Sequence, residues 1–351
     1  MTTNQGDTTP VREGFRFDEA RLSAWLQDNI DGFAGPPTVR QFHGGQSNPT
    51  FELLTPARSY VLRRQPAGAL LKGAHAVDRE ARVMSALARV EFPVPQVYAL
   101  CRDPDVIGSM FYIMEKVDGR CFRDAGFPSV PRNERASYLD AMNATLAQLH
   151  GVDIEQVGLQ DFGRPDNYLA RQVQRWSKQY LDDSEAGRNP HMDEVIPWLQ
   201  AHIPSASDVS IIHGDFRVDN MIFHPHEPKV VAVLDWELST LGDPIADFTY
   251  NLMMYRVPPH MWGGLRGVDL AAQGLIDEAE YIRRYCARTR RAGIEDVTFY
   301  LVFNFFRFAA ILHGVKGRVL RGTAAGTDAA AAAANLDYLA EQAAHLARAG
   351  V

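Results

Sequence analysis

The sequence predicts an α+β protein in two parts, a small antiparallel sheet followed by a larger, mostly helical region. Between residues 39 and 114, short apolar runs alternate with turn residues, which is typical of strands. From about residue 130 onward, apolar residues recur mostly at helical spacing. The chain has 351 residues, enough for two such parts with a core each.

The boundaries that we predict divide the chain into a leader and two structured parts. Residues 1–14 are polar and lack an apolar run, so we expect a disordered leader and no signal peptide. Residues 15–116 form the first part, and residues 117–351 form the second.

The first part contains strand patterns interrupted by two helices. Asp18 suits a helix cap, and the apolar residues after it fall on one face. A second apolar stripe predicts a helix that ends before the Pro-rich stretch at residues 92–95. The expected helices are Asp18–Ile30 and Val77–Val90, and the expected strands are Val39–Phe42, Phe51–Leu54, Tyr60–Arg64, Val97–Cys101 and Met110–Met114, the last two as an antiparallel pair.

A glycine turn at residues 44–50 separates the first two of these strands. Its backbone N–H groups can point at phosphate oxygens, with Gly45 and Ser47 as the candidate contacts. A plain hairpin turn is the alternative. The stretch is not a P-loop, because no Gly-Lys-Ser/Thr follows it.

The second part is dominated by amphipathic helix patterns. His150 ends the first of them and is interpreted as a helix-end or core histidine rather than a ligand. The helices that we expect are Ser137–His150, Tyr168–Asp182, Val195–His202, Ala246–Tyr255, Asp277–Arg290, Thr298–Leu320 and Ala329–Arg348.

Several basic side chains in these helices are candidates for contact with an anionic substrate. They are Arg171, Arg175, Lys178, Arg307 and Arg318. For Arg171, Arg175 and Lys178, a solvated helix face around one buried tryptophan is the more ordinary interpretation. Arg307 lies in a strongly apolar helix and therefore needs a partner if it points inward. Either a substrate anion or an internal carboxylate such as Asp247 meets that need.

Composition limits the classes of function. The net charge of −7 argues against nonspecific nucleic-acid binding and against a generally basic membrane-binding face. Three widely spaced cysteines without a C-x-x-C pair argue against a disulfide framework and a structural zinc site. They suit a reducing compartment, and we expect a cytoplasmic protein. The one long apolar zone, residues 299–315, is interrupted by polar residues.

Two polar clusters at the ends of short strand patterns carry the strongest signal. The first is His213–Asn220, and the second begins at Asp235, directly after the apolar run 230–234. We expect Asp215, Asn220 and Asp235 to converge at one end of a small hairpin system. Such a set serves phosphoryl transfer, in which one carboxylate orients a hydroxyl and accepts its proton, while an amide oxygen and a second carboxylate hold Mg²⁺.

The two clusters read His-Gly-Asp-Phe-Arg-Val-Asp-Asn and Leu-Asp-Trp-Glu, and a third stretch, residues 241–248, reads Leu-Gly-Asp-Pro-Ile-Ala-Asp-Phe. They resemble the aminoglycoside phosphotransferase and choline kinase family, and most closely its branch associated with acyl-CoA dehydrogenases. The resemblance runs from about Val39 to about Arg321. It implies a bilobal protein-kinase-like fold, in which residues 15–116 bind the nucleotide and residues 117–351 carry the catalytic loop and the substrate-binding helices.

The resemblance also implies roles in nucleotide binding. Arg63 stands where the family commonly has a phosphate-binding Lys, so the charge is kept while the reach differs. Glu80 stands near the helix glutamate that pairs with this basic residue. A solvated Arg63 and a Glu80 paired with its helix neighbours are the alternatives. The stretch Glu115–Gly119 matches the hinge whose backbone meets the adenine, with Glu115 and Val117 as the candidate contacts.

Further implied roles concern the catalytic loop. Asp215 is the catalytic carboxylate, and Arg217 stands where a protein kinase places a lysine that contacts the γ-phosphate. A structural contact is the alternative for Arg217. His213 is expected to support the loop by hydrogen bonding, and Asp243 and Asp247 are expected to brace it.

The sequence therefore predicts a kinase that uses ATP and Mg²⁺ to phosphorylate a hydroxyl group on a small molecule. The basic helix residues and the resembled branch favour a hydroxy acid or hydroxyacyl-CoA and a functional link to an acyl-CoA dehydrogenase. The alternatives are a catalytically weak nucleotide-binding regulatory module, an aminoglycoside-type antibiotic kinase, and a nucleotide-dependent reaction other than phosphorylation.

Overall fold

The computed structural model describes residues 8–42, 48–66, 75–205, 208–323 and 329–350. Within it the chain forms two compact units. The first unit contains residues 1–122, 155–159 and 219–239, and the second contains residues 123–154, 160–218 and 240–351. The segment 219–239 therefore belongs with the N-terminal sheet, although it follows helices of the second unit in the sequence.

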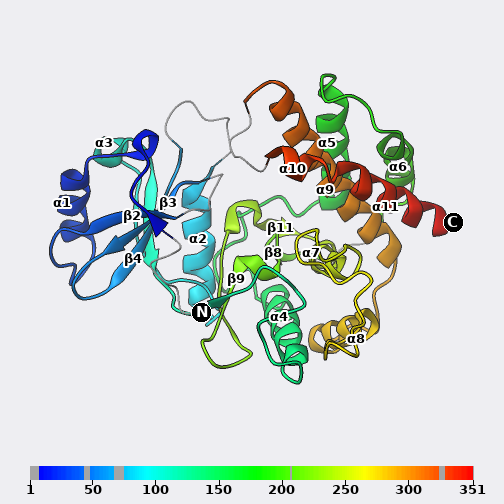
Figure 1. Cartoon of the computed structure of the whole chain (residues 1–351), viewed down its shortest axis with the longest axis horizontal. Helices are drawn as coiled ribbons and strands as arrows, with labels where there is room; N and C mark the ends of the chain where they lie inside the picture. The colour runs from blue at the N-terminus through cyan, green and yellow to red at the C-terminus, as the bar shows by residue number, and fades with distance from the viewer. Residues whose placement is uncertain (1–7, 43–47, 67–74, 206–207, 324–328, 351) are drawn as a thin grey trace. The chain divides into compact units, whose positions relative to one another are not determined.

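A six-stranded sheet, with every neighbouring pair antiparallel, forms the centre of the first unit (Figure 1). The order of its strands is β1-β2-β3-β4-β6-β5. β5 and β6 pair as predicted, with a register shift between Val97 and Ala99. The strands are β1 (Thr8–Thr9), β2 (Thr38–Phe42), β3 (Thr50–Leu54), β4 (Ser59–Arg64), β5 (Val97–Cys101) and β6 (Phe111–Glu115).

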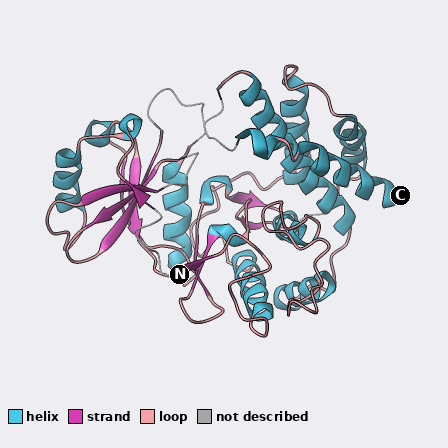
Figure 2. Ribbon diagram, viewed as in Figure 1, coloured by secondary structure: helices cyan, strands magenta, loops and turns pink. Residues whose placement is uncertain are grey.

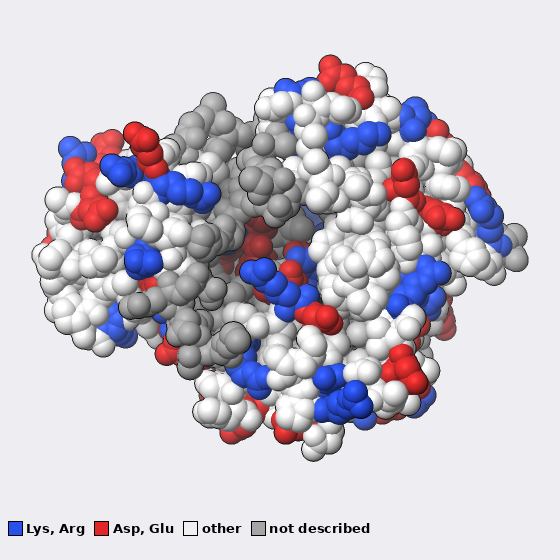
Figure 3. Space-filling model, in the orientation of Figure 1, with Lys and Arg blue, Asp and Glu red and all other residues white. Residues whose placement is uncertain are grey.

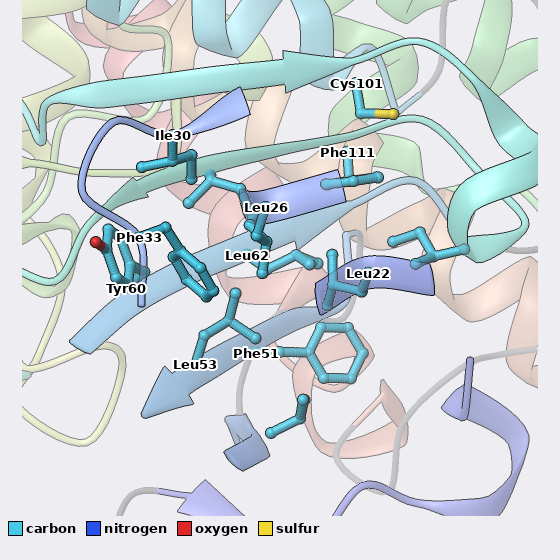
Figure 4. Close-up of a cluster of buried hydrophobic side chains, with 13 residues drawn as sticks. Leu22, Leu26, Ile30, Phe33, Phe51, Leu53, Tyr60, Leu62, Cys101 and Phe111 are labelled. Atoms are coloured by element: carbon cyan, nitrogen blue, oxygen red, sulfur yellow. The ribbon is translucent and has the colours of Figure 1, made fainter. Parts of the chain in front are cut away.

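The two faces of this sheet pack against different helices. Alternation along β4 places Leu62 in a cluster with Leu22 and Leu26 of α1 (Glu19–Asn29), as Figure 4 shows. Asp18 caps α1 by accepting hydrogen bonds from two backbone N–H groups. α2 (Val77–Ala88) contacts β5 and β6 and carries the buried Glu80. The short α3 (Pro104–Ile107) packs on α1.

The first unit also contains a small three-stranded sheet with the order β10-β9-β7. Met221 pairs with Val233 in the antiparallel pair of β9 and β10, as predicted for a hairpin. The short helix η4 packs on α2. These elements are β7 (Arg120–Cys121), η3 (Val218–Asn220), which begins one residue before the unit boundary, β9 (Met221–Phe223), β10 (Val230–Val233) and η4 (Trp236–Leu238).

The second unit is mostly helical, with one strand pair of its own (Figure 2). β8 (Ser210–Ile212) pairs with β11 (Thr240–Gly242) and not with β9. The helices are α4 (Arg135–His150), α5 (Tyr168–Asp182), α6 (Pro190–Ala201), α7 (Pro244–Leu252), η5 (Met253–Tyr255), α8 (Glu278–Thr289), α9 (Val297–Leu320), α10 (Ala329–Ala333) and α11 (Leu336–Ala349).

α9 is the core helix of the second unit. It contacts α5, α6, α7, α10 and α11, and its residues 299–310 are buried except Phe308. By length and composition α9 could cross a membrane, but 78% of its most apolar 18-residue window is buried inside the protein. Burial of this kind is typical of the central helix of a folded domain.

Three expectations need correction. Residues 1–14 are not a disordered leader throughout, because Thr8–Thr9 pair with β2 and the Thr8 side chain is buried. The predicted single hairpin system is instead two separate sheets, with β8 apart from β9 and β10. α6 begins at Pro190 rather than Val195, because Asn189 caps it and proline is tolerated in the first turn.

The charge distribution agrees with the composition. On the face shown in Figure 3, Lys and Arg side chains are scattered among Asp and Glu rather than gathered into one basic field. Among the described residues, many of the arginines are paired with neighbouring carboxylates, for example Arg288 with Asp140. An extended basic surface of the kind that binds nucleic acid is not seen on this face.

Candidate active site

The first unit holds a buried charge cluster built on β4, α2 and the end of β10. Arg63 lies with its Nε 2.8 Å from Glu80 Oε2 and its Nη2 2.6 Å from Asp235 Oδ1. Glu237 lies 3.9 Å from the same Nη2. Arg63 therefore joins a strand, a helix and the second polar cluster, and the solvated alternative for this residue is wrong.

Glu80 is 1% exposed and is held by two further side chains. Tyr112 donates from its hydroxyl to Oε2 at 3.1 Å, and Asn48 donates from Nδ2 to Oε1 at 2.7 Å. Burial raises the pKa of Glu80, and the charge of Arg63 offsets part of that rise. Burial alone would lower the pKa of Arg63, but the surrounding carboxylates outweigh it and raise that pKa. The prediction that Glu80 pairs with Arg63 is thus confirmed by their geometry.

Arg64, the next residue, points to the opposite face of the sheet. Its Nη1 donates to the Ile107 carbonyl at 3.1 Å, and its guanidinium lies over the rings of Phe17 and Phe51. Alternation along the strand therefore sends one arginine to the charge cluster and the other to the α1 side.

Asn220 and Asp235 lie at the same end of the β9–β10 pair. The Leu234 N–H donates to the Asn220 carbonyl at 2.8 Å, which fixes the two residues at neighbouring chain positions. Asp235 has a positive φ of 63°, an uncommon conformation that presents its carboxylate at the turn into η4. Amide and carboxylate oxygens are hard donors that suit Mg²⁺, so the residue types at this strand end fit that ion.

The second unit holds Asp215 on the loop that follows β8. The Tyr250 hydroxyl donates to Asp215 Oδ1 at 2.5 Å, and Arg217 Nε lies 3.5 Å from the same oxygen. Burial and the charge of Asp215 raise the pKa of Tyr250 well above its usual value, so the phenol stays a proton donor. Two side chains, Tyr250 and Arg217, therefore hold the Oδ1 atom of Asp215 in position.

The loop itself is held through its backbone by α7. Asp247 accepts hydrogen bonds from the N–H groups of His213 and Gly214, both at 2.8 Å. His150 Nε2 lies 3.2 Å from the same carboxylate. Burial alone would raise the pKa of Asp247, but His150 and the hydrogen bonds from His213 outweigh it and lower that pKa. Asp247 therefore remains ionised and braces the loop, as the sequence predicted.

Other braces complete this arrangement. His213 Nδ1 lies 3.1 Å from the Asp215 N–H, which matches the support role predicted for His213. Gly214 has a φ of 83°, a conformation that favours glycine. Asp243 caps α7 and accepts a hydrogen bond from the Tyr300 hydroxyl at 2.8 Å.

The partner of Arg307 differs from both expectations. Arg307 is 7% exposed, and its Nη2 donates to the Gly214 carbonyl at 2.6 Å. Its guanidinium also lies over the Tyr250 ring at 5.3 Å. A backbone carbonyl and an aromatic face therefore satisfy it, in place of a substrate anion or the Asp247 carboxylate.

The other basic candidates lie on ordinary helix surfaces. Arg171 donates to the Arg164 carbonyl, Arg175 lies over the Trp176 ring, and Lys178 pairs with Asp182 at 2.7 Å. Trp176 is buried, which agrees with a solvated face around one tryptophan. Arg318 is exposed near the end of α9, and His313 is buried with Nε2 2.7 Å from the Gly187 carbonyl.

The remaining predicted nucleotide contacts are Gly45, Ser47, Glu115 and Val117. Gly45 and Ser47 lie outside the described residues. The Glu115 N–H donates to the Gln96 carbonyl at 2.8 Å, and its side chain is exposed. Val117 is half-buried just after β6. The hinge role of Glu115 and Val117 stays a prediction.

Sequence reasoning missed Tyr250 and Asn251. Asn251 donates to the Phe216 carbonyl at 3.1 Å and accepts from the Tyr281 hydroxyl at 2.6 Å. The spacing from Asp247 to Tyr250 and Asn251 is three and four residues, which places all three on one helix face. That spacing, read together with the assigned role of Asp247, is the signal that would have found them.

Comparisons with known proteins place these features in a family. Residues 38–284 match the model of the phosphotransferase enzyme family. The chain therefore belongs to this family, whose kinase-type chemistry agrees with the carboxylate and amide arrangement described above.

The curated relatives are longer proteins. Acyl-CoA dehydrogenase family member 10 of Mus musculus is 41% identical over 92% of this chain and 30% of its own length. Acyl-CoA dehydrogenase family member 11 of Gallus gallus is 42% identical over 95% of this chain and 44% of its own length. The chain thus spans less than half of these relatives.

Solved structures show the same fold. A candidate aminoglycoside phosphotransferase from Ralstonia eutropha JMP134 is 46% identical, with a TM-score of 0.86 over 95% of this chain and 99% of that one. Choline kinase from Cryptosporidium parvum has a TM-score of 0.63 at 13% identity, over 93% of this chain and 95% of that one. A thermostable mutant of aminoglycoside phosphotransferase APH(4)-Ia, crystallised with ADP and hygromycin B, has a TM-score of 0.61 at 12% identity, over 94% of this chain and 98% of that one. The last two show the fold alone, and together these structures confirm the predicted kinase-like α+β architecture.

Proposed function

We propose that the protein is a small-molecule kinase that transfers the γ-phosphate of ATP to a hydroxyl group, with Mg²⁺ as the metal. The observation that carries the proposal is Asp215, a carboxylate fixed by Tyr250 and Arg217 on a loop whose backbone Asp247 holds. Membership of the phosphotransferase family and the ADP complex of a neighbour with the same fold support the use of ATP.

Each residue has a role in this proposal. Asp215 accepts a hydrogen bond from the acceptor hydroxyl, orients its oxygen and takes its proton. Tyr250 and Arg217 keep the carboxylate in one orientation, and Arg217 adds positive charge where negative charge develops. Positioning of this kind supplies a large part of the rate enhancement in phosphoryl transfer.

Asn220 and Asp235 would hold the metal, and Arg63 would bind phosphate oxygens while Glu80 fixes its position. When bound, Mg²⁺ neutralises charge on the phosphate oxygens. Glu115 and Val117 are the proposed backbone contacts of the adenine, and Gly45 and Ser47 the proposed contacts of the phosphates.

The proposed acceptor is a hydroxy acid or a hydroxyacyl-CoA. The support comes from the relatives, which are named as acyl-CoA dehydrogenases. A functional link to such an enzyme follows from the same resemblance. Arg307 does not support an anionic acceptor, because its guanidinium already donates to the Gly214 carbonyl.

One observation favours a second candidate function, a nucleotide-binding regulatory module. Arg63 lies 2.6 Å from Asp235 Oδ1, so a proposed metal ligand is engaged by a guanidinium. If this pair persists with nucleotide bound, metal binding and turnover would be weak.

A screen by mass spectrometry tests these proposals. The protein is incubated with ATP, Mg²⁺ and pooled hydroxy acids, hydroxyacyl-CoAs, choline-like alcohols, sugars and aminoglycosides. We expect one class to gain a single phosphate, and we expect Asp215→Ala to lower that rate by about 10²–10⁴-fold. Asp182→Ala is the matched control, because Asp182 is an exposed helix aspartate.

Three other results would change the conclusion. Equal phosphorylation by Asp215→Ala would exclude Asp215 as the catalytic carboxylate. Binding of ATP and Mg²⁺ without product in any pool would favour the regulatory module. A product whose mass differs from the substrate by anything other than one phosphate would indicate another nucleotide-dependent reaction.

A further inference from the structure

The second unit contains a cavity of about 60 Å³ that is lined by Phe216, Arg217 and Val218, the residues that directly follow Asp215. Tyr250 and Arg217, the two side chains that contact the Asp215 carboxylate, are both part of its wall. Most of the remaining wall is apolar. We refer to it as the methionine–aromatic cavity, after Met142, Met253, Met254, Tyr250, Trp262 and Phe308.

The position of this cavity determines which part of an acceptor molecule would contact it. A hydroxyl that donates to Asp215 has its carbon atom about one bond length further away, next to the side chains that hold the carboxylate. Tyr250 and Arg217 both contact the Asp215 carboxylate and line the methionine–aromatic cavity, so this cavity is the candidate neighbour of a group attached to that carbon.

The aromatic wall is built by specific backbone geometry. Trp262 has a φ of 51°, which is uncommon for a bulky residue. Gly263 follows with a φ of 65°, and a Cβ there would lie 2.4 Å from Asp124 Cα. The indole packs against Phe308, with ring centroids 4.5 Å apart. Phe308 is the half-buried exception in the otherwise buried 299–310 stretch of α9.

The charges around the cavity select against cations. Its described lining includes the guanidinium of Arg217 and has no Asp or Glu side chain. Aromatic rings attract cations, but the Tyr250 ring already carries the guanidinium of Arg307 at 5.3 Å. A polycationic sugar or a quaternary ammonium group would therefore meet two positive charges here, with Asp215 as its nearby counter-charge.

The size of the cavity limits it to part of a ligand. Whole sites for drug-sized ligands measure roughly 300–1,000 Å³. A volume of about 60 Å³ instead matches a short hydrocarbon group. Methionine side chains adapt to such groups, because they are unbranched and polarizable.

We propose that the methionine–aromatic cavity is the subsite for a short, uncharged hydrocarbon group next to the acceptor hydroxyl, so that the acceptor is an aliphatic alcohol rather than a cationic one. The proposal rests on the proposed function for its use in catalysis. Its binding component stands on the geometry of the second unit and is measurable without nucleotide.

The test is a ligand-observed NMR titration of the full chain, without ATP, with 2-alkanols of four to eight carbons, kanamycin and choline. We expect the alkanols to bind, with the dissociation constant falling about fourfold for each added methylene until the cavity is filled. Kanamycin and choline should bind at least tenfold more weakly than the best alkanol.

Two substitutions locate the binding. Met254→Trp narrows the cavity at a half-buried position and should weaken the best alkanol at least tenfold. Phe308→Ala enlarges the cavity and should lower the gain in alkanol affinity for each added methylene. Leu320→Ala is the matched control on the same helix, because Leu320 is 60% exposed, and it should bind as the parent does. Melting temperatures of all variants establish that they are folded.

The proposal would be overturned if the dissociation constant of the alkanols did not depend on their chain length, or if choline bound as tightly as the best alkanol. Unchanged alkanol binding in both folded cavity variants would overturn it too. If alkanols bind as expected but no alcohol gains phosphate, the proposed kinase function fails while the subsite stands. If phosphate is transferred to a cationic acceptor and Met254→Trp has no effect on it, the subsite fails while the kinase function stands.

Discussion

Two carboxylates, Glu80 in the first unit and Asp247 in the second, are buried to a similar degree but are held in different ways. Glu80 has a charged partner, Arg63, together with two neutral donors. Asp247 is held mainly by backbone N–H groups of His213 and Gly214, with His150 beside it. The pKa of Glu80 is raised, whereas that of Asp247 is lowered.

This contrast determines how each carboxylate can respond to a ligand. A pair of side-chain charges can separate and meet another ligand, such as a phosphate, at the cost of leaving a charge buried for a time. Backbone donors cannot rotate away without unfolding their loop, so they fix geometry. The Arg63 cluster of the first unit can therefore rearrange around a ligand, whereas the Asp215 loop of the second unit is held rigidly.

The largest effect on stability is expected from Arg63→Met, which leaves Glu80 buried without its counter-charge. Loss of one partner of a buried pair costs about 3–5 kcal/mol of unfolding free energy. Urea denaturation at pH 7 measures it. The raised pKa of Glu80 should rise further in the variant, so the folded state binds a proton more tightly than the unfolded state. Part of the loss should then be recovered as pH falls.

The double variant Arg63→Met with Glu80→Gln is the control for this interpretation. It removes the isolated charge and should be more stable than Arg63→Met alone. A single variant as stable as the parent would show that the charge pair contributes nothing to folding.

Asp247→Asn should weaken the hydrogen bonds that hold the Asp215 loop. In the parent, both carboxylate oxygens accept a hydrogen bond from a backbone N–H group. The amide of Asn offers one oxygen only, so at least one N–H group loses its acceptor, which lowers the free energy of unfolding by about 1–3 kcal/mol. Thermal unfolding measures the loss. Because the pKa of Asp247 is lowered, its contribution in the parent is complete above the unfolded-state pKa near 3.8 and disappears as pH falls through the folded-state value.

The stability difference between parent and Asp247→Asn should therefore shrink in acid, the opposite of the reasoning for Glu80. A difference that grows as pH falls would contradict the assignment. Turnover of the acceptor found in the screen should also fall in this variant, because the Asp215 loop loses its brace.

Tyr250→Phe should separate the orientation of Asp215 from the binding of ATP. It removes one hydrogen bond to a charged group, worth about 1.5–3 kcal/mol, while the ring stays packed. We expect kcat to fall at least tenfold with KM for ATP unchanged. Steady-state kinetics measure both. A change in KM for ATP alone would place Tyr250 outside the orientation of Asp215.

Lys178→Ala should have the smallest effect. Lys178 and Asp182 form an exposed pair one helical turn apart, and such pairs contribute less than about 0.5 kcal/mol. Denaturation and kinetics should both match the parent. A tenfold rise in KM for the acceptor would instead restore the substrate-facing interpretation of this helix.

The local pattern of the sequence was sufficient for several features. Asp18 marked the start of α1, and the apolar run before Arg63 marked β4. The proline after Asp243 begins α7, two residues before the predicted start at Ala246. These are short-range effects of capping, strand periodicity and fixed φ, which neighbouring residues determine. The roles assigned to Asp215, Asn220 and Asp235 came from residue type and spacing, and they remain predictions about function.

The family, the kinase-like α+β class and the chemistry that the motifs can serve thus follow from residue types and their spacing in the chain. The contact partners depend instead on the folded structure: β8 pairs with β11, Arg307 binds the Gly214 carbonyl, and Tyr250 holds Asp215. Such contacts join residues tens of positions apart. No local preference encodes them, because they depend on how helices and strands pack once the whole unit has folded.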